Sequence, residues 1–406
     1  PTPNPASATM RAISLALGLA LLAAPAVATA DESLPGKIVL DMRLRDETVD
    51  QDGFAKSAQA LTLRTRLGYE TPAWLGFKGL IEGENVVALD AAYNSTTNGK
   101  VLYPVVGDPE VTQLNRAQVT WTGGQGDVVV GRQRIVLVNA RFVGNAGFRQ
   151  TEQTFDAARI DYRPTGDLSL TYVYLDKVHR VFTERSAQGS WDSESHLVQA
   201  DWKTATGQFT GYAYLLDFTN APTQSNATWG LRFAGSHPLQ PGLALTYEVE
   251  AARQADYRNS PTAFDLGYLD LGVGLKAGPR WAMLAVERLD GDGRRGFQTP
   301  LATLFAYQGW ADVFLTTPAT GVRDASLGGG TTVPLGSKAT PLKLQAVAHD
   351  FTDDDGSRRL GHELDLLAAL PINKLLSAEL RAAFFDGARP GFADRRKIWL
   401  TLEAKY

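Results

Sequence analysis

The chain has 406 residues, with 40 Lys and Arg against 44 Asp and Glu, which gives a formal net charge of −4 at pH 7. A nucleic-acid-binding protein would be expected to carry a strongly basic patch, so this charge argues against nucleic acid as a partner. The sequence contains no cysteine, which excludes thiolate catalysis and cysteine metal sites and fits an exported chain.

The first element in chain order is a targeting segment. Arg11 precedes an Ala/Leu-rich apolar run from Ala12 to Val27, and the small-residue triplet 28–30 follows that run. This is the pattern of a secretory signal peptide with its cleavage site. We predict that residues 1–30, with the extra residues at their start, are a cleaved signal peptide and that residues 31–406 form the barrel described below. The alternative, an uncleaved anchor, requires a longer apolar run.

After the targeting segment, the dominant signal is an alternation of apolar and polar residues. No apolar run there is long enough for a transmembrane helix, so a membrane-embedded form must be a closed barrel. A soluble sandwich also alternates, but an apolar face on nearly every strand of so long a domain indicates a sheet that faces lipid. The alternation is clearest at residues 38–45, 61–70, 243–250, 363–368 and 376–381.

Short turn-like links alternate with longer ones, as in outer-membrane barrels. We count about 19 candidate strands, whereas a single-chain bacterial barrel with both ends in the periplasm needs an even number. The weakest candidate, Tyr307 to Leu315, fits better in one long outer loop from about Asp290 to Thr320, which can fold inward over the pore mouth. We therefore predict an all-β fold, a single-chain transmembrane antiparallel β-barrel of about 18 strands.

The last ten residues alternate between apolar and polar positions and end on an aromatic residue, Tyr406. This pattern is typical of barrels of the Gram-negative outer membrane, although a soluble edge strand is the alternative. We predict a location in the cell outer membrane, with lipid and lipopolysaccharide around the barrel. The outer-membrane insertion machinery is expected to bind the strand that ends at Tyr406.

The densest charged segment is GRQRIVLVNARFVGNAGFRQTEQTFDAARIDYR, residues 131–163. In its second strand, Ile160 and Tyr162 are expected to face lipid, which puts Arg159 and Asp161 in the lumen. The face of the first strand stays open, because residues 128–130 are three consecutive valines. Inward guanidinium groups make a fixed positive field at a constriction, and interleaved carboxylates hold them in place. The alternative is a set of ion pairs that only keeps the barrel open.

Enzymatic interpretations find little support. The sequence lacks the G-x-S-x-G, H-E-x-x-H, Walker and dinucleotide-binding motifs, and its five histidines are scattered. The segments 290–293 and 353–356 resemble calcium loops without the closing Glu, so we interpret them as solvated loop tips. We predict no enzyme activity, no cofactor and no metal site.

The run GRQRIVLVNARFVGNAGFRQTEQTFDA, preceded by YPVVGDPEVTQLNRAQV and followed by GWADVFLTTPATGVRD and HDF, resembles the alginate-export family of outer-membrane porins. The resemblance covers most of residues 31–406. It implies an 18-stranded barrel that passes the polyanion alginate through a narrow, arginine-lined pore. By position, it implies that Arg132, Gln133 and Arg134 line the constriction, with Asp156 and Arg159 as their partners and Arg43, Arg64 and Arg66 completing the ring. Arg141, Arg149 and Asp161 of the charged segment complete the predicted substrate-binding set.

The expected function is an outer-membrane channel for passive passage of anionic or sugar-like solutes, including an acidic polysaccharide such as alginate. A fold does not identify a solute, and the chain leaves little room for a long periplasmic plug loop. A small anion or sugar therefore fits as well as alginate. The alternatives are a porin of broad or hydrophobic-solute specificity and a closed structural or enzymatic barrel.

Overall fold

The computed structural model describes residues 35–336, 339–388 and 390–406, so the predicted signal peptide lies outside the described residues. The described chain forms 18 strands and two single-turn 3-10 helices. In chain order these are β1 (Lys37–Gln51), β2 (Ala58–Glu70), β3 (Phe77–Ala92), β4 (Val111–Gly123), β5 (Gly126–Gln133), β6 (Thr154–Tyr162), β7 (Leu168–His179), β8 (Ser190–Lys203), β9 (Gln208–Leu216), η1 (Pro222–Gln224), β10 (Asn226–Gln240), β11 (Leu243–Ala255), β12 (Asp265–Ala277), β13 (Arg280–Leu289), η2 (Leu304–Ala306), β14 (Val322–Leu335), β15 (Thr340–Thr352), β16 (Arg359–Pro371), β17 (Leu376–Gly387) and β18 (Arg395–Lys405).

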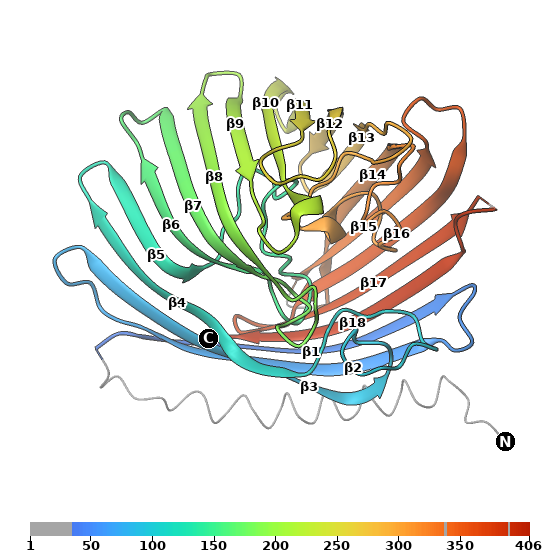
Figure 1. The fold of residues 1–406 in the computed structure, drawn as a ribbon, viewed down its shortest axis with the longest axis horizontal. Coiled ribbons are helices and arrows are strands. Elements are labelled where there is room, and N and C mark those ends of the chain that lie inside the picture. Colours follow the sequence, from blue (N-terminus) through green and yellow to red (C-terminus); the bar gives the residue numbers. More distant parts are fainter. Residues whose placement is uncertain (1–34, 337–338, 389) are drawn as a thin grey trace.

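The strands form one closed barrel (Figure 1). Each strand pairs antiparallel with the next in sequence, and β18 pairs antiparallel with β1 to close the sheet. At this seam, Arg43 lies opposite Glu403 on one side and opposite Arg64 on the other. The predicted fold class, a single-chain antiparallel barrel of 18 strands, is confirmed.

The alternation in the sequence separates the two faces of the sheet. Successive side chains of a strand point to opposite faces, so every second residue points outward. The outward residues are largely apolar and well exposed, as at Leu67 (60%) and Ile81 (58%), whereas the inward residues beside them are polar. An apolar outer face and a polar interior are the arrangement that lipid outside and water inside favour.

The links between strands differ at the two ends of the barrel. Links that follow even-numbered strands are short, and we call their end the turn rim; links that follow odd-numbered strands include the longest ones, and we call their end the loop rim. Gly124, Gly242 and Gly278 adopt positive φ in two-residue links of the turn rim, where tight hairpins need that conformation. β1 continues to Gln51, so the first loop has only the six residues 52–57.

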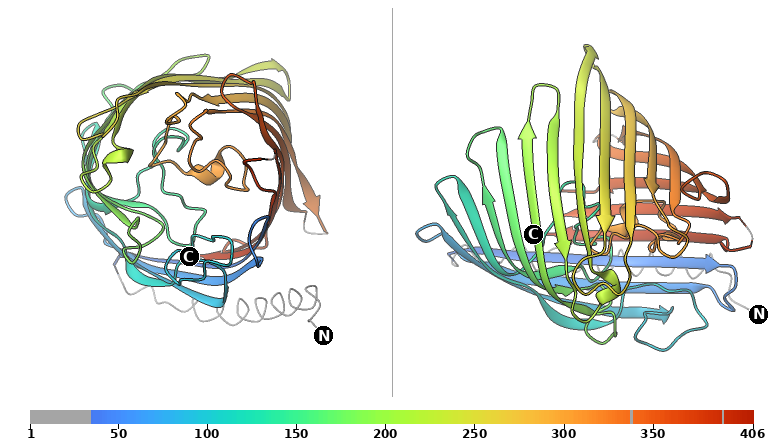
Figure 2. Two further views of the ribbon diagram at one scale, coloured as in Figure 1. Left: turned by 45° about the vertical axis from the view of Figure 1, so that its right-hand side comes forward. Right: turned by 45° about the horizontal axis from the view of Figure 1, so that its top comes forward.

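Two loops of the loop rim, residues 134–153 and 290–321, fold into the barrel (Figure 2). They hold each other through backbone bonds: the Gly144 amide donates to Leu301 O (2.8 Å), and the Thr303 amide donates to Ala140 O (3.0 Å). The apolar core lies inside the barrel, where Phe142 of the first loop packs among inward-facing aromatic rings of the wall. The second loop takes the inward path that its length allows, and the segment 307–315 is no strand.

In the part of the chain that the structure describes, no helix has the length and apolar character to cross a bilayer.

Candidate functional site

An arginine cluster lies on the lumen face of β1 and β2. Alternation places Arg43 and Arg64 on this face, and their backbones lie opposite each other in the sheet. Arg43 donates to Glu403 of β18 (2.7 Å) and to the Gly147 carbonyl of the inward loop (3.0 Å). Arg64, fully buried, donates to Asp41 (2.5 Å). Arg43 therefore attaches the loop to the wall, whereas Arg64 is a buried charge held by carboxylates of β1 and β18.

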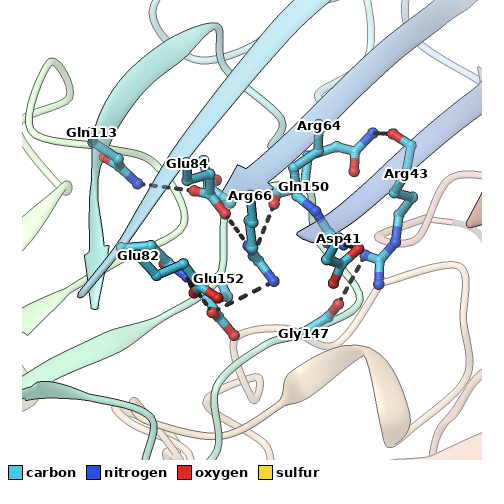
Figure 3. A network of polar contacts seen from close by, with 12 residues as sticks. Asp41, Arg43, Arg64, Arg66, Glu82, Glu84, Gln113, Gly147, Gln150 and Glu152 are labelled. Carbon is cyan, nitrogen blue, oxygen red and sulfur yellow. Dashed lines mark hydrogen bonds and ion pairs between the residues drawn. The ribbon is translucent and has the colours of Figure 1, made fainter. Parts of the chain in front are cut away.

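Arg66 is the next inward arginine of β2, and Figure 3 shows it between two carboxylates. Its guanidinium donates to Glu84 (2.6 Å) and lies 3.5 Å from Glu152 of the inward loop. Arg134 forms a second ion pair with Glu152 (2.5 Å). Burial alone would raise the pKa of Glu152, but Arg66 and Arg134 outweigh it and lower this pKa to about 2. Glu152 is therefore a fixed negative charge that ties the end of the loop to the arginines.

Arg141 anchors the other part of this loop to the opposite wall. Its fully buried guanidinium pairs with Glu287 of β13 (2.5 Å) and donates to Thr299 (3.0 Å). Burial alone would lower the pKa of Arg141, but Glu287 outweighs it and raises this pKa above its ordinary value. The loop therefore spans the lumen, with Arg66 and Arg134 near one end and Arg141 at the far wall.

Arg149 joins both inward loops to β1. It pairs with Glu47 (3.1 Å) and with Asp312 of the loop 290–321 (2.8 Å). Lys397 of β18 contacts the same two carboxylates, at 3.3 Å and 2.7 Å. Burial alone would lower the pKa of Arg149, but Glu47 and Asp312 outweigh it and raise this pKa. Sequence reasoning missed Glu47, Asp312 and Lys397; only the alternation along β1 could have placed Glu47 on the lumen face.

A stacked aromatic pair closes part of the lumen between the two loops. The rings of Phe148 and Phe305 are parallel, with centroids 3.4 Å apart, and both meet Trp399 of β18 edge-on. The guanidinium of Arg381 lies over both phenyl rings, and that of Arg45 lies 4.2 Å from the Phe148 ring. These stacked rings, with cations over their faces, narrow the lumen between the two loops, and we call them the aromatic constriction.

The predicted lumen positions on β6 agree with the structure. Arg159 and Asp161 face inward and form an ion pair of 2.7 Å, and Thr171 of β7 donates to Asp161 (2.7 Å). Gln133 also faces inward but is buried, where its amide donates to the Ala157 carbonyl (3.0 Å). Gln133 thus joins β5 to β6, and Arg159 is the residue of this group that lies at the lumen surface.

Two predicted site residues, Arg132 and Asp156, face outward, so their expected place in the lumen is wrong. Arg132 shares its face with Val130, which is 54% exposed, and Asp156 shares its face with Ile160, which is 46% exposed. They lie opposite each other in the sheet and form an ion pair of 2.8 Å, to which His179 adds a second contact with Asp156. They are indeed partners, but on the outer surface of the barrel near the loop rim.

A group of carboxylates lies on the lumen face of β14 and β16, close to β1 around the barrel wall, and sequence reasoning did not anticipate it. Glu363 and Asp365 of β16 accept the backbone amides of Ala311 (2.7 Å) and Trp310 (3.1 Å). Next to them, Asp324 of β14 contacts His349 (2.9 Å). These carboxylates of β16 therefore bind the loop 290–321 to the wall through its backbone amides.

The described residues contain no group of three or more His, Asp or Glu side chains placed to hold a metal ion. Ser195 faces the lumen and bonds to Ser193, while His196 faces outward and contacts Tyr172. Residues that are adjacent in a strand point to opposite faces, so this serine and histidine cannot act together.

A closed 18-stranded barrel with an apolar outside, a charged lumen and inward loops has the architecture of an outer-membrane porin. Solved structures with this fold include OpdL of Pseudomonas aeruginosa (TM-score 0.68, 16% identity), which covers 91% of this chain and 98% of its own. OccAB2 of Acinetobacter baumannii (0.69, 13%) and OccK9 of P. aeruginosa (0.69, 15%) each match 91% of this chain and 98% of their own. No protein-family model and no curated protein matches the chain.

These neighbours are porins of the OprD/Occ group, so the resemblance to the alginate-export family is wrong. An arginine- and carboxylate-rich inward loop is a property of charged porin lumens and does not identify one family. Alginate export and a polysaccharide solute are likewise unsupported. These neighbours show the fold of this chain, and the channel role and outer-membrane location stay predictions.

Proposed function

We propose that the chain is a passive outer-membrane channel for small anionic or sugar-like solutes. The observation that carries this proposal is the arginine cluster of β1, β2 and the loop 134–153 at the aromatic constriction. Guanidinium groups stay charged at all working pH values and bind carboxylates through two parallel hydrogen bonds. Each arginine already has a carboxylate partner, so no single arginine binds a solute anion too tightly. The anion can therefore pass from one guanidinium group to the next.

The constriction favours small solutes over a polymer. Phe148 and Phe305 are in contact, and the loops that carry them are attached to several strands. A porin of broad or hydrophobic-solute specificity would have less use for the arginine cluster, and a closed structural barrel would not conduct. In this proposal, lipid surrounds the apolar outer face, with lipopolysaccharide nearest the loop rim. Insertion through the last strand and cleavage after residue 30 stay predictions.

Currents through the purified protein in planar bilayers test this function. The reversal potential in a potassium chloride gradient should indicate a preference for anions, and Arg43→Gln should weaken that preference. The matched control is Arg253→Gln, which removes an exposed arginine paired with Asp265 and should change nothing. The proposal would be refuted if the barrel never conducts, or if Arg43→Gln leaves the anion preference unchanged.

A further inference from the structure

A cavity of about 350 Å³ opens on the loop-rim side of the aromatic constriction. Phe148 and Phe305 form part of its lining. Its charged lining consists of four cations and one carboxylate: Arg149, Arg180, Arg395, Lys397 and Asp312. A solute anion that enters from this side therefore meets an excess of positive charge directly above the constriction.

The single carboxylate of this cavity, Asp312, is bound as a solute carboxylate would be. One of its oxygens accepts from Arg149 Nη2 (2.8 Å) and from Lys397 Nζ (2.7 Å), and its backbone carbonyl accepts from Arg395 (2.9 Å). Deeper in the wall, Glu47 contacts the same Arg149 and Lys397. Without Asp312, the three cations Arg45, Arg149 and Lys397 would share the two carboxylates of Glu47 and Asp108, which leaves one positive charge for an incoming anion.

The segment that carries Asp312 has an unfavourable backbone. Gln308 and Asp312 have φ values of +52° and +60°, a region in which residues other than glycine are uncommon. Gly309 lies between them at φ +79°, and a Cβ there would clash with the Glu363 carboxylate, so a side chain would have to displace that group. A strained segment of this kind persists because its surroundings hold it, and the contacts of Asp312 are among those that hold it.

From the cavity, the contacts of Asp312 and the strained backbone, we propose that Asp312 competes with the solute anion for binding to Arg149 and Lys397. Its carboxylate occupies the anion site of Arg149 and Lys397 and keeps the segment 308–312 docked, which holds Phe305 against Phe148. A solute carboxylate displaces it, the segment is released, and the two rings separate. This inference rests on the proposed channel function and adds to it a gate that the solute itself opens.

Single-channel recording in sodium chloride and in sodium acetate of equal ionic strength tests the gate, with acetate as the carboxylate probe. In the unmodified protein, acetate should raise the open probability severalfold and in a saturable way. Asp312→Asn keeps the size of the side chain and its tolerance of positive φ, and it should be open in chloride with no further response to acetate. The control Asp355→Asn, in the exposed loop after β15, should behave as the unmodified protein.

A cross-link gives a second test that does not depend on Asp312. A Cβ at Gly144 would lie 3.1 Å from the Cβ of Thr303, slightly closer than the usual separation in a disulfide. Because the chain has no other cysteine, the pair Gly144→Cys and Thr303→Cys can join the two loops selectively. The oxidised protein should stay closed in acetate and recover its response after reduction.

The outcomes separate this gate from the channel itself. Currents that are independent of acetate, of Asp312→Asn and of the cross-link would overturn the gate and leave the channel standing. A cross-linked protein that opens in acetate like the unmodified one would also overturn the gate. Absence of current in both salts, with every variant, would overturn the channel and the gate together.

Discussion

Arg141 of the loop 134–153 and Glu287 of β13 form an ion pair of 2.5 Å, although 146 positions separate them in the sequence. The guanidinium is fully buried, so the carboxylate compensates a charge that water does not reach. The pair attaches the middle of the loop to the wall opposite the strand from which the loop emerges.

Removing the acidic partner of this pair should destabilise the protein. Glu287→Gln leaves the Arg141 guanidinium buried without a counter-charge, which costs about 3 kcal/mol or more. Urea unfolding in detergent micelles measures the loss. The exposed pair of Arg253 and Asp265 is the control, since Asp265→Asn should leave the free energy of unfolding nearly unchanged. Equal effects of both substitutions would contradict the anchoring role of Arg141.

The pairing of Glu152 should make the docking of the loop 134–153 dependent on pH. Its folded pKa of about 2 lies below the ordinary value of 4.5, so its contribution is fully present above about pH 4.5 and is lost as the pH falls towards 2. A shift of this size corresponds to about 3 kcal/mol. Protection of this loop from hydrogen exchange, taken relative to the intrinsic exchange rate at each pH, should fall over that window, and in Glu152→Gln much of that fall should disappear. The same pH profile in both proteins would count against the ion pairs with Arg66 and Arg134.

The faces of β5 and β6 predict opposite results for two arginines. Arg159→Gln removes a lumen cation and leaves Asp161 uncompensated, so the anion preference should fall. One unit charge a few ångströms from the permeating ion in a wet lumen contributes about 0.5–1 kcal/mol, or roughly a two- to fivefold change in the permeability ratio. Arg132→Gln, on the outer surface, should leave the ratio unchanged. Reversal potentials of the two variants, measured under the same conditions, test this prediction. If Arg132→Gln changes the permeability ratio as much as Arg159→Gln does, the assignment of the two faces is wrong.

The stacked rings should limit the size of the solutes that pass. Phe148→Ala removes one ring, which should weaken the docking of the loops by about 1 kcal/mol beyond the lost buried area and should widen the constriction. Single-channel conductance and the size limit for sugars in liposome swelling should both increase. Leu67→Ala, a substitution on the exposed outer face, is the control for conductance and for the size limit. If conductance stays at the level of the unmodified protein, the narrowest point lies elsewhere.

Local alternation was enough to predict the barrel and the lumen face of Arg43, Arg64, Arg66 and Arg159, because one apolar and one polar face repeat along each of those strands. It left the face of Arg132 open, because three consecutive valines make both faces apolar, and the lumen position that the family resemblance implied for Arg132 is wrong. There, only the pairing of β5 with β6 decides which way the arginine points.

The partners of the inward loops were beyond the reach of sequence patterns. Asp312 meets Arg149 across 163 positions, and no local repeat records that contact. The position of Asp312 depends on the path of the loop 290–321 through the lumen. The mistaken family resemblance has a similar origin, since charged loops of different porins share residue types without sharing a solute.

The seam between β1 and β18 has a consequence for how the protein acquires its lumen. Arg43 and Glu403 are 360 positions apart, so their contact must wait until both ends of the sheet meet. Contacts of such long range are slow to form, because the chain entropy is lost before the interaction is gained. An incomplete sheet would hold the arginines of β1 without their partners on β18, and the electrostatic character of the interior should therefore emerge late in assembly, together with closure, rather than hairpin by hairpin.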